Sequence, residues 1–163
     1  MAEFSLSVAW HLKRGDEFEP GKYSQDHDWT FTGGEVVPAS GAANLGGSPD
    51  RANPEEALIA AASSCHMLTF LAIAAKSQLK MVSYLDQPTG VVGTIEGGRK
   101  AVTEITLRPR VVFSEGEMSE EDLMKLHESA HKYCFIANSL TTDIKIEPQH
   151  EFRPLQRHPH QIR

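Results

Sequence analysis

Cysteine is scarce in this sequence: Cys65 and Cys134 are the only two among 163 residues. A secreted domain stapled by disulfides is usually shorter and richer in cysteine. We therefore expect a cytoplasmic protein whose cysteines are reactive, metal-binding or merely buried. The residues after Met1 lack the basic stretch and apolar run of a secretory signal, which agrees with that expectation.

Positive charge is also in short supply, with 16 Lys and Arg against 22 Asp and Glu and a formal net charge of -6. Nucleic-acid binding needs a basic face, so this balance argues against a nucleic-acid partner. The longest apolar run, residues 57–75, is interrupted by Ser63, Ser64, His66 and Thr69, and no basic flank or aromatic belt frames it. We interpret this run as a helix buried in protein, and we expect no membrane contact.

The chain length and a hydrophobic content of 40% suit one domain with a hydrophobic core. We place this domain at residues 1–148 and a polar tail at 149–163. Strands are predicted at 4–12 and 28–37, where β-branched and aromatic residues gather. A loop rich in Gly, Ala, Ser and Pro is predicted at 38–51.

A long helix is predicted from Pro54 to about residue 79. Asn53 is a suitable N-cap, Pro54 suits the first helical position, and Glu56 stands where a capping box needs it. Apolar residues occupy both the face that carries Cys65 and the opposite face. A helix that is apolar nearly all round needs cover on both sides. In a chain this small, we expect a second subunit to provide part of that cover.

Further predicted elements follow the long helix: strands at 91–96, 101–113 and 144–146, and helices at 120–133 and 134–140. Gly97 and Gly98 are expected to form a hairpin turn between the first two of these strands. Ser119 precedes three acidic residues and is expected to begin the second helix. No internal repeat or long linker suggests a second domain.

Taken alone, the two cysteines are well explained as small buried apolar side chains, because free cysteine is among the most buried residue types. Two features point instead to reactivity. Ser64 and His66 flank Cys65, and Cys134 lies at a predicted helix boundary, where a helix N-terminus lowers the pKa of a thiol. A low-pKa thiol beside a second thiol suits peroxide chemistry. The first becomes a sulfenic acid, and the second condenses with it to a disulfide.

Three segments resemble the OsmC/Ohr family. Residues 53–58 (NPEEAL) and 64–71 (SCHMLTFL) are similar to the central helix of that family. Residues 134–140 (CFIANSL) resemble its second cysteine motif. Its N-terminal hairpin is similar to the stretch that holds Trp29, Phe31, Gly33 and Gly34. The resemblance covers most of residues 4–147, and the histidine after Cys65 is typical of the OsmC-like branch.

The resemblance implies an α+β fold in which two central helices are enclosed by antiparallel β-sheets in an intertwined homodimer. It implies that Cys65 is the peroxidatic cysteine and Cys134 the resolving cysteine. It further implies that Glu55 is the glutamate that pairs with an arginine holding the thiolate. The implied substrate is an organic hydroperoxide and the implied reductant a dithiol or lipoyl group, with no metal or organic cofactor.

The position of Glu55 leads to an expectation about assembly. Glu55 and Cys65 are ten residues apart on one predicted helix, or about 15 Å along its axis. A carboxylate cannot span that distance. If Glu55 contributes directly to a site, we expect it to serve the Cys65 of another chain at a dimer interface.

The chain departs from the family pattern where an arginine is expected. Residues 23–27 resemble the segment that carries it, but here Gln25 stands in its place. A glutamine can form hydrogen bonds but supplies no positive charge to lower the pKa of a thiol. Arg14, Lys22 and His27 are candidates to replace that charge, and each is otherwise an ordinary surface residue.

His66 is a further candidate for a supporting role as a base or ligand. A histidine on a buried helix more often serves as a hydrogen-bonded structural residue. His27, His66, Cys65 and Cys134 could in principle form a metal site. Their spacings match no metal motif, so we expect no bound metal.

The leading hypothesis for function is a two-cysteine peroxidase. Its apolar helical surroundings suit organic hydroperoxides better than hydrogen peroxide. One alternative is a non-catalytic dimer that binds a small ligand, which Gln25 favours. Another is a redox-sensing dimer whose cysteines only respond to oxidation.

Overall fold

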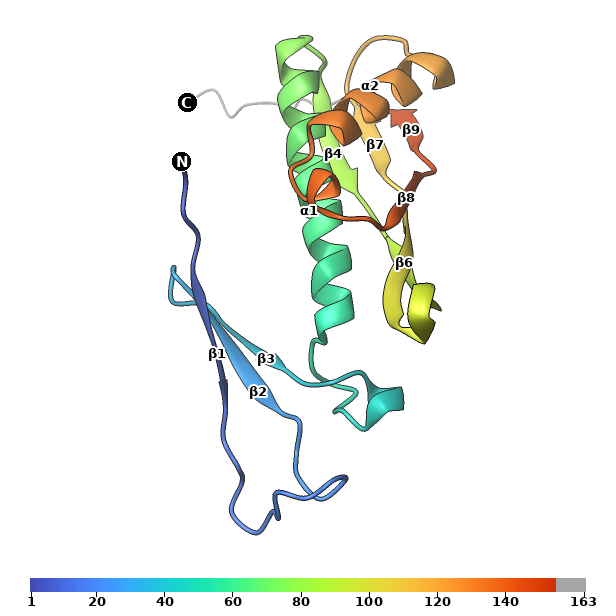
Figure 1. Cartoon of the computed structure of the whole chain (residues 1–163). Coiled ribbons are helices and arrows are strands. Elements are labelled where there is room, and N and C mark those ends of the chain that lie inside the picture. Colours follow the sequence, from blue (N-terminus) through green and yellow to red (C-terminus); the bar gives the residue numbers. More distant parts are fainter. Residues whose placement is uncertain (155–163) are drawn as a thin grey trace, which may run out of the picture. The chain divides into compact units, whose positions relative to one another are not determined.

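The computed structural model describes residues 1–154, so the predicted tail beyond residue 154 lies outside the described part. The chain divides into two compact units, Met1–Leu58 and Ile59–Arg163, which are described separately. Figure 1 shows helices and strands in both, and the α+β class implied by the resemblance is confirmed.

The first unit contains an antiparallel sheet of three strands in the order β1-β2-β3: Leu6–Trp10, His27–Phe31 and Val36–Ala39. The single strand predicted at 28–37 is therefore two strands. They are joined by a tight turn in which Gly34 adopts a positive φ of 88°, a conformation that glycine tolerates best. A short 3-10 helix, η1, covers Ala43–Leu45.

Helix α1 spans Pro54–Lys76, and its predicted start is confirmed. The side chain of Asn53 accepts a hydrogen bond from the Glu56 amide at 2.9 Å, and the Glu56 carboxylate accepts one from the Asn53 amide at 3.3 Å. These reciprocal bonds form a capping box. The helix ends before the predicted residue 79, because Gln78 has a left-handed φ of 59°.

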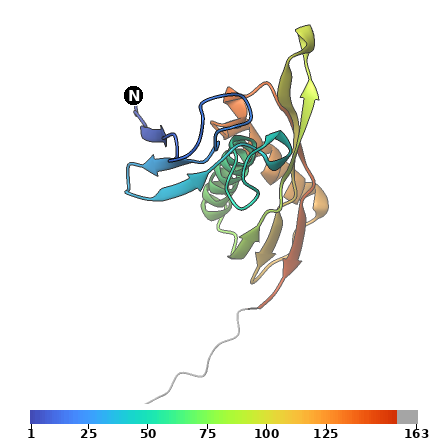
Figure 2. The same ribbon diagram turned by 90° about the horizontal axis from the view of Figure 1, so that it is seen from below.

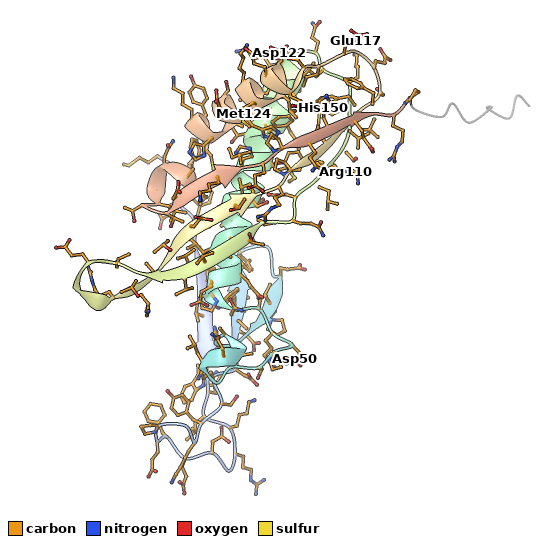
Figure 3. All side chains as sticks on the ribbon, turned by 90° about the vertical axis from the view of Figure 1, so that its right-hand side faces the viewer. Asp50, Arg110, Glu117, Asp122, Met124 and His150 are labelled. Carbon is orange, nitrogen blue, oxygen red and sulfur yellow. The ribbon has the colours of Figure 1, made fainter. Side chains whose placement is uncertain are left out.

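The strands of the second unit form two three-stranded sheets that follow one another as the halves of a bent ribbon. One half has the order β4-β7-β9: Met81–Leu85, Arg110–Phe113 and Gln149–Phe152. The other half has the order β5-β6-β8: Thr89–Thr94, Lys100–Leu107 and Asp143–Ile146. Arg110 and His150, labelled in Figure 3, come from neighbouring strands of the first half.

The bend has a chemical cause, since one proline lies between the two halves of each strand path: Pro88, Pro109 and Pro148. Proline lacks an N–H and cannot continue the hydrogen-bond ladder. The strand predicted at 101–113 is consequently two strands, β6 and β7. Its apolar side chains keep one face across the bend, and Ile105, Leu107, Val111 and Phe113 are all buried.

Two strands correct the sequence analysis. β4 was not predicted. β9 occupies residues that were assigned to a polar tail, and it pairs in parallel with β7, from Arg110 opposite Gln149 to Phe113 opposite Phe152. The strand ladder therefore continues past residue 148 to Phe152. Gly97 and Gly98 do form the predicted turn, as the short helix η2 over Glu96–Gly98.

Helix α2 spans Glu120–Tyr133, as predicted, and Ser119 is its N-cap, accepting a hydrogen bond from the Asp122 amide at 3.0 Å. Cys134 is the C-cap residue. The helix predicted at 134–140 is shorter than expected, since only Ala137–Ser139 form a turn of 3-10 helix, η3.

The core of the second unit lies between the helices and the bent ribbon. Phe70 and Ala74 of α1 pack with Val111 and Phe113 of β7 and with Leu123 of α2. Figures 1 and 2 show the two helices side by side on one side of these strands. α1 also has the length and a mean hydropathy, 1.8, that would suit a membrane span, but core helices of soluble proteins share both properties.

Candidate active site

The two cysteines, 69 residues apart in sequence, meet in the second unit. Cys65 lies in the middle of α1 and is partly exposed, whereas Cys134 caps the end of α2 and is buried. The Cys134 thiol is placed to donate a hydrogen bond to the sulfur of Cys65. Both cysteines are free thiols in this structure.

The chain around Cys134 supplies backbone donors to both sulfurs. The amides of Phe135 and Ile136 donate to Cys65 Sγ, and the amide of Ala137 donates to Cys134 Sγ at 3.4 Å. These residues lead into the η3 turn, where backbone N–H groups have no helical partner. The result is a small nest of amides that favours an anionic sulfur at position 65.

This environment separates the two thiols chemically. Burial raises the pKa of Cys65, but the hydrogen bonds from Cys134 and from the amides of Ile136 and Phe135 outweigh it, so the net shift is downward. Burial and the hydrogen bond to Cys65 raise the pKa of Cys134 to about 11. As pH rises, Cys65 therefore ionises before Cys134.

Cys65 opens onto an apolar groove of about 670 Å³. Its walls come from α1, from the end of α2 and from the segment after it: Ala61, Ser64, Leu68, Thr69, Ala72, Tyr133, Phe135 and Ile136. Thr69 donates its hydroxyl to the Cys65 carbonyl at 2.8 Å, and the same side chain helps to lower the pKa of Cys65. The groove can hold an apolar ligand with its reactive atom near Cys65 Sγ.

His66 does not reach this groove. It is buried on the adjacent face of α1, and its Nε2 lies 2.9 Å from Nδ1 of His127 on α2. The two rings are nearly parallel, with an interplanar angle of 6°. His66 is therefore hydrogen-bonded to α2, and no contact within residues 1–154 makes it a base for Cys65.

The remaining predicted site residues lie in the first unit. Glu55 is in the first turn of α1, ten residues before Cys65 on the same helix, which fits the expectation that it does not touch its own cysteine. Gln25 donates its amide to the Leu45 carbonyl at 3.0 Å, and His27 Nδ1 lies 2.8 Å from the Gln25 carbonyl. Lys22, a candidate to replace the arginine, is paired with two glutamates.

No group of three or more His, Cys, Asp or Glu within residues 1–154 is arranged to hold a metal ion. Within the described part of the second unit, His66, Cys65 and Cys134 are not arranged as a metal-binding group. The cysteine pair is therefore the chemically distinctive feature of the described chain.

Sequence reasoning missed several residues of this region. His127 is the partner of His66, and the amides of Phe135 and Ile136 bind Cys65. One signal was available, since His127, His131 and Cys134 recur at intervals of four and three residues, which places them on one face of α2.

The fold and the paired thiols define a small α+β protein of the OsmC/Ohr type. A family model described as OsmC-like protein matches residues 47–149, so the chain belongs to the OsmC-like family. An OsmC-like protein of unknown function from Vibrio cholerae is 41% identical, with a TM-score of 0.86 over 91% of this chain and 99% of that one.

More distant solved structures share the fold. An organic hydroperoxide resistance protein from Elizabethkingia anophelis is 18% identical, with a TM-score of 0.68 over 93% of this chain and 97% of that one. The organic hydroperoxide resistance protein OhrB of Bacillus subtilis is 13% identical, with a TM-score of 0.63 over 92% of this chain and 98% of that one. A search of curated proteins found no match.

Proposed function

We propose that this protein is a thiol peroxidase that reduces organic hydroperoxides through Cys65 and Cys134. The observation that carries the proposal is that the two thiols differ in pKa and in access to the groove. Cys65 has a lowered pKa and faces a groove, while Cys134 has a raised pKa and is hydrogen-bonded to Cys65. A nucleophile must be ionised and accessible, and a resolving thiol must be close and held in reserve.

The first step consumes the hydroperoxide. The Cys65 thiolate attacks the terminal oxygen of ROOH, and the O–O bond breaks. A sulfenic acid forms on Cys65, and the alkoxide takes up a proton and leaves as ROH. Sulfur is oxidised by two electrons and the peroxide is reduced by two. The amides of Phe135 and Ile136 stabilise the thiolate before attack.

The second step protects Cys65 from further oxidation. The Cys134 sulfur attacks the Cys65 sulfur, the S–O bond breaks, and water leaves as the disulfide forms. A dithiol, such as a lipoyl-type group, then exchanges with the disulfide, becomes a cyclic disulfide itself and restores both thiols. Partial exposure of Cys65 gives such a reductant a sulfur to attack. A cytoplasmic location, which we also propose, would supply reducing partners.

The lining of the groove supports an organic substrate. Leu68, Tyr133 and Phe135 offer apolar contact to an alkyl or aryl group but nothing specific to hydrogen peroxide. Two solved structures of the same fold carry the description organic hydroperoxide resistance protein.

We further propose that the working form is a homodimer. On α1, the stripe Ala60, Ser64, Leu68 and Ala72 is exposed in the single chain, opposite the buried stripe on which His66 lies. In the first unit, the hairpin also exposes Leu6, Val8, Phe31 and Val36. A second copy would cover the hairpin residues and form a further wall of the groove without filling it, so that Leu68 still contacts the substrate. It could also bring its own Glu55 to a Cys65 that the first copy's Glu55 cannot reach.

A non-catalytic OsmC-like dimer that binds a ligand or senses oxidation is the second candidate. Gln25 favours it, because it stands where the resemblance leads us to expect an arginine, and its amide is engaged with Leu45. Without that positive charge, the cysteine pair relies on neutral donors to lower the pKa of Cys65.

Mass spectrometry after one equivalent of cumene hydroperoxide separates these candidates. A peroxidase loses two hydrogens and yields a Cys65–Cys134 linked peptide, and it then turns over with dithiothreitol. Cys65→Ser should lose all reaction, whereas Cys134→Ser should stop at the sulfenic acid. Two intact thiols in the treated wild-type protein would rule out the peroxidase, and a linkage without turnover would indicate a sensor.

A further inference from the structure

A histidine pair inside the second unit has no part in the chemistry proposed above. His66 and His127 have exposed fractions of 1% and 0%, and their hydrogen bond of 2.9 Å joins α1 to α2. Phe70 stacks on His127 with ring centroids 4.2 Å apart, and Tyr84 approaches it from β4. The pair is thus enclosed by both helices and by the sheet.

The pair is neutral at physiological pH. Burial lowers the pKa of His66 to about 4 and that of His127 to about 3, and His131 on α2 adds a lowering effect on His66. Asp86, after β4, raises the pKa of His66 only in part, and burial keeps the nearby Tyr84 hydroxyl un-ionised by raising its pKa. The hydrogen bond therefore joins two neutral rings, and one N–H donates it.

Such a pair is a poor source of stability. Within the described residues, His66 Nδ1 and His127 Nε2 have no hydrogen-bond partner. Whichever tautomers the rings adopt, one buried N–H is left unpaired, which costs roughly 1–3 kcal/mol. Apolar side chains of similar size would avoid that cost, so a purely structural role does not explain two histidines here.

What the bond provides is register between the helices. His66 directly follows Cys65 on α1, and Cys134 comes seven residues after His127, two turns along the same face of α2. Apolar packing is non-directional, whereas a hydrogen bond fixes both the sliding and the rotation of α2. A slip of one turn is about 5.4 Å. A disulfide tolerates Cα separations of only about 4.4–6.8 Å.

We propose that His66 and His127 are positioning residues whose hydrogen bond sets the register of α2 on α1, so that Cys134 stays within bonding reach of Cys65. The inference rests on the proposed function in one respect, since it assumes that the two cysteines form a disulfide. It extends that function, because it makes the α1–α2 interface important for disulfide formation and not for the attack on the peroxide.

Two double variants test the register role. His66→Leu with His127→Leu removes the bond and keeps an apolar interface. His66→Gln with His127→Asn places amide atoms near the original Nε2 and Nδ1 positions and can restore the bond. His131→Leu is the matched control, because it removes another histidine from α2 between His127 and Cys134. The readouts are the rate of sulfenic acid formation and the equilibrium between Cys65–Cys134 disulfide and a dithiothreitol buffer.

In the leucine pair, we expect sulfenic acid formation within about threefold of wild type and a disulfide equilibrium constant lowered by roughly tenfold or more. We expect the amide pair and His131→Leu to stay within about threefold of wild type in both readouts. If the leucine pair fails to fold, the amide pair still decides. A tenfold loss in the amide pair, or no loss in the leucine pair, overturns the register role. A wild-type protein that forms no disulfide overturns the proposed function along with it.

Discussion

The thiol of Cys134 is placed to donate a hydrogen bond to the sulfur of Cys65, and this relationship makes two side chains of the same kind chemically unequal. The donor acquires a pKa of about 11, while the acceptor is shifted below the usual thiol value. Each cysteine therefore tunes its partner before any oxidant arrives.

Replacing Cys134 should raise the pKa of Cys65 when the new side chain cannot donate a hydrogen bond. Cys134→Ala removes the donor, and Cys134→Ser keeps an O–H in its place. A hydrogen bond to a charged group contributes about 1.5–3 kcal/mol. We expect iodoacetamide to alkylate Cys65 roughly tenfold more slowly at pH 7 in the alanine variant than in the serine variant. Equal rates in the two variants would show that the backbone amides alone lower the pKa.

The pH dependence of labelling should differ between the two thiols of the wild-type protein. The thiolate is the reactive form, so labelling of Cys65 rises with pH until its lowered pKa is passed and then levels off. Cys134, with a pKa of about 11 and 1% exposure, should stay unlabelled at pH 8. Peptide mapping of samples quenched between pH 5 and pH 10 checks this. Preferential labelling of Cys134 would reverse the proposed roles.

The starts of α1 and α2 could be predicted from the sequence to the residue, whereas two strands could not be predicted at all. Caps such as Asn53 and Ser119 are local signals, because the side chain binds an amide three residues away. β9 reads QHEF, with no apolar alternation, and becomes a strand only by pairing with β7. β4 has a register shift between Met81 and Ser83 that obscures its periodicity. Long-range pairing of this kind leaves little trace in a local pattern.

The candidate site also contains some residues that the sequence could predict and others that it could not. The two cysteines were predicted as partners only through the family resemblance, because a gap of 69 residues carries no geometric information. His127 was missed because one histidine on an amphipathic helix reads as a surface residue until its depth is known. The amide donors of Phe135 and Ile136 have no side-chain signature at all.

The histidine pair should make the protein sensitive to acid. The folded-state pKa values of about 4 and 3 lie below the ordinary 6.5, so the unfolded chain binds more protons between these values. The free energy of unfolding is therefore unaffected above pH 6.5 and falls as pH drops from 6.5 to about 4. Two histidines give a slope of up to roughly 2.7 kcal/mol per pH unit.

Urea unfolding of wild type and of the His66→Leu, His127→Leu variant at pH 7, 6, 5 and 4.5 measures this effect. The carboxylates are common to both proteins, so the difference between the two curves isolates the histidines. We expect the variant to be at least as stable as wild type at pH 7 and increasingly more stable as pH falls. Parallel curves would mean that the pair is not neutral and buried as described.

The capping box at the start of α1 should contribute measurable stability. Asn53→Ala removes the acceptor for the Glu56 amide and should lower the free energy of unfolding by about 1 kcal/mol. Asn53→Asp keeps that acceptor and should stay within about 0.5 kcal/mol. Urea titration checks both variants. Similar losses in both would point to an effect of position 53 unrelated to capping.

Leu68 should determine how well the groove discriminates among peroxides. It is 60% exposed in the single chain and lines the groove beside Cys65. Leu68→Ala removes apolar contact to the organic group and none to hydrogen peroxide. We expect kcat/KM for cumene hydroperoxide to fall roughly tenfold, with that for hydrogen peroxide changed less than about twofold.

Leu85→Ala is the matched control, because Leu85 is 57% exposed on β4 and lies outside this groove. An equal loss toward both peroxides in Leu68→Ala would indicate disturbance of Cys65 itself, and an equal loss in the control would indicate general destabilisation. Only a loss confined to the organic peroxide, with the control unaffected, supports substrate contact at Leu68.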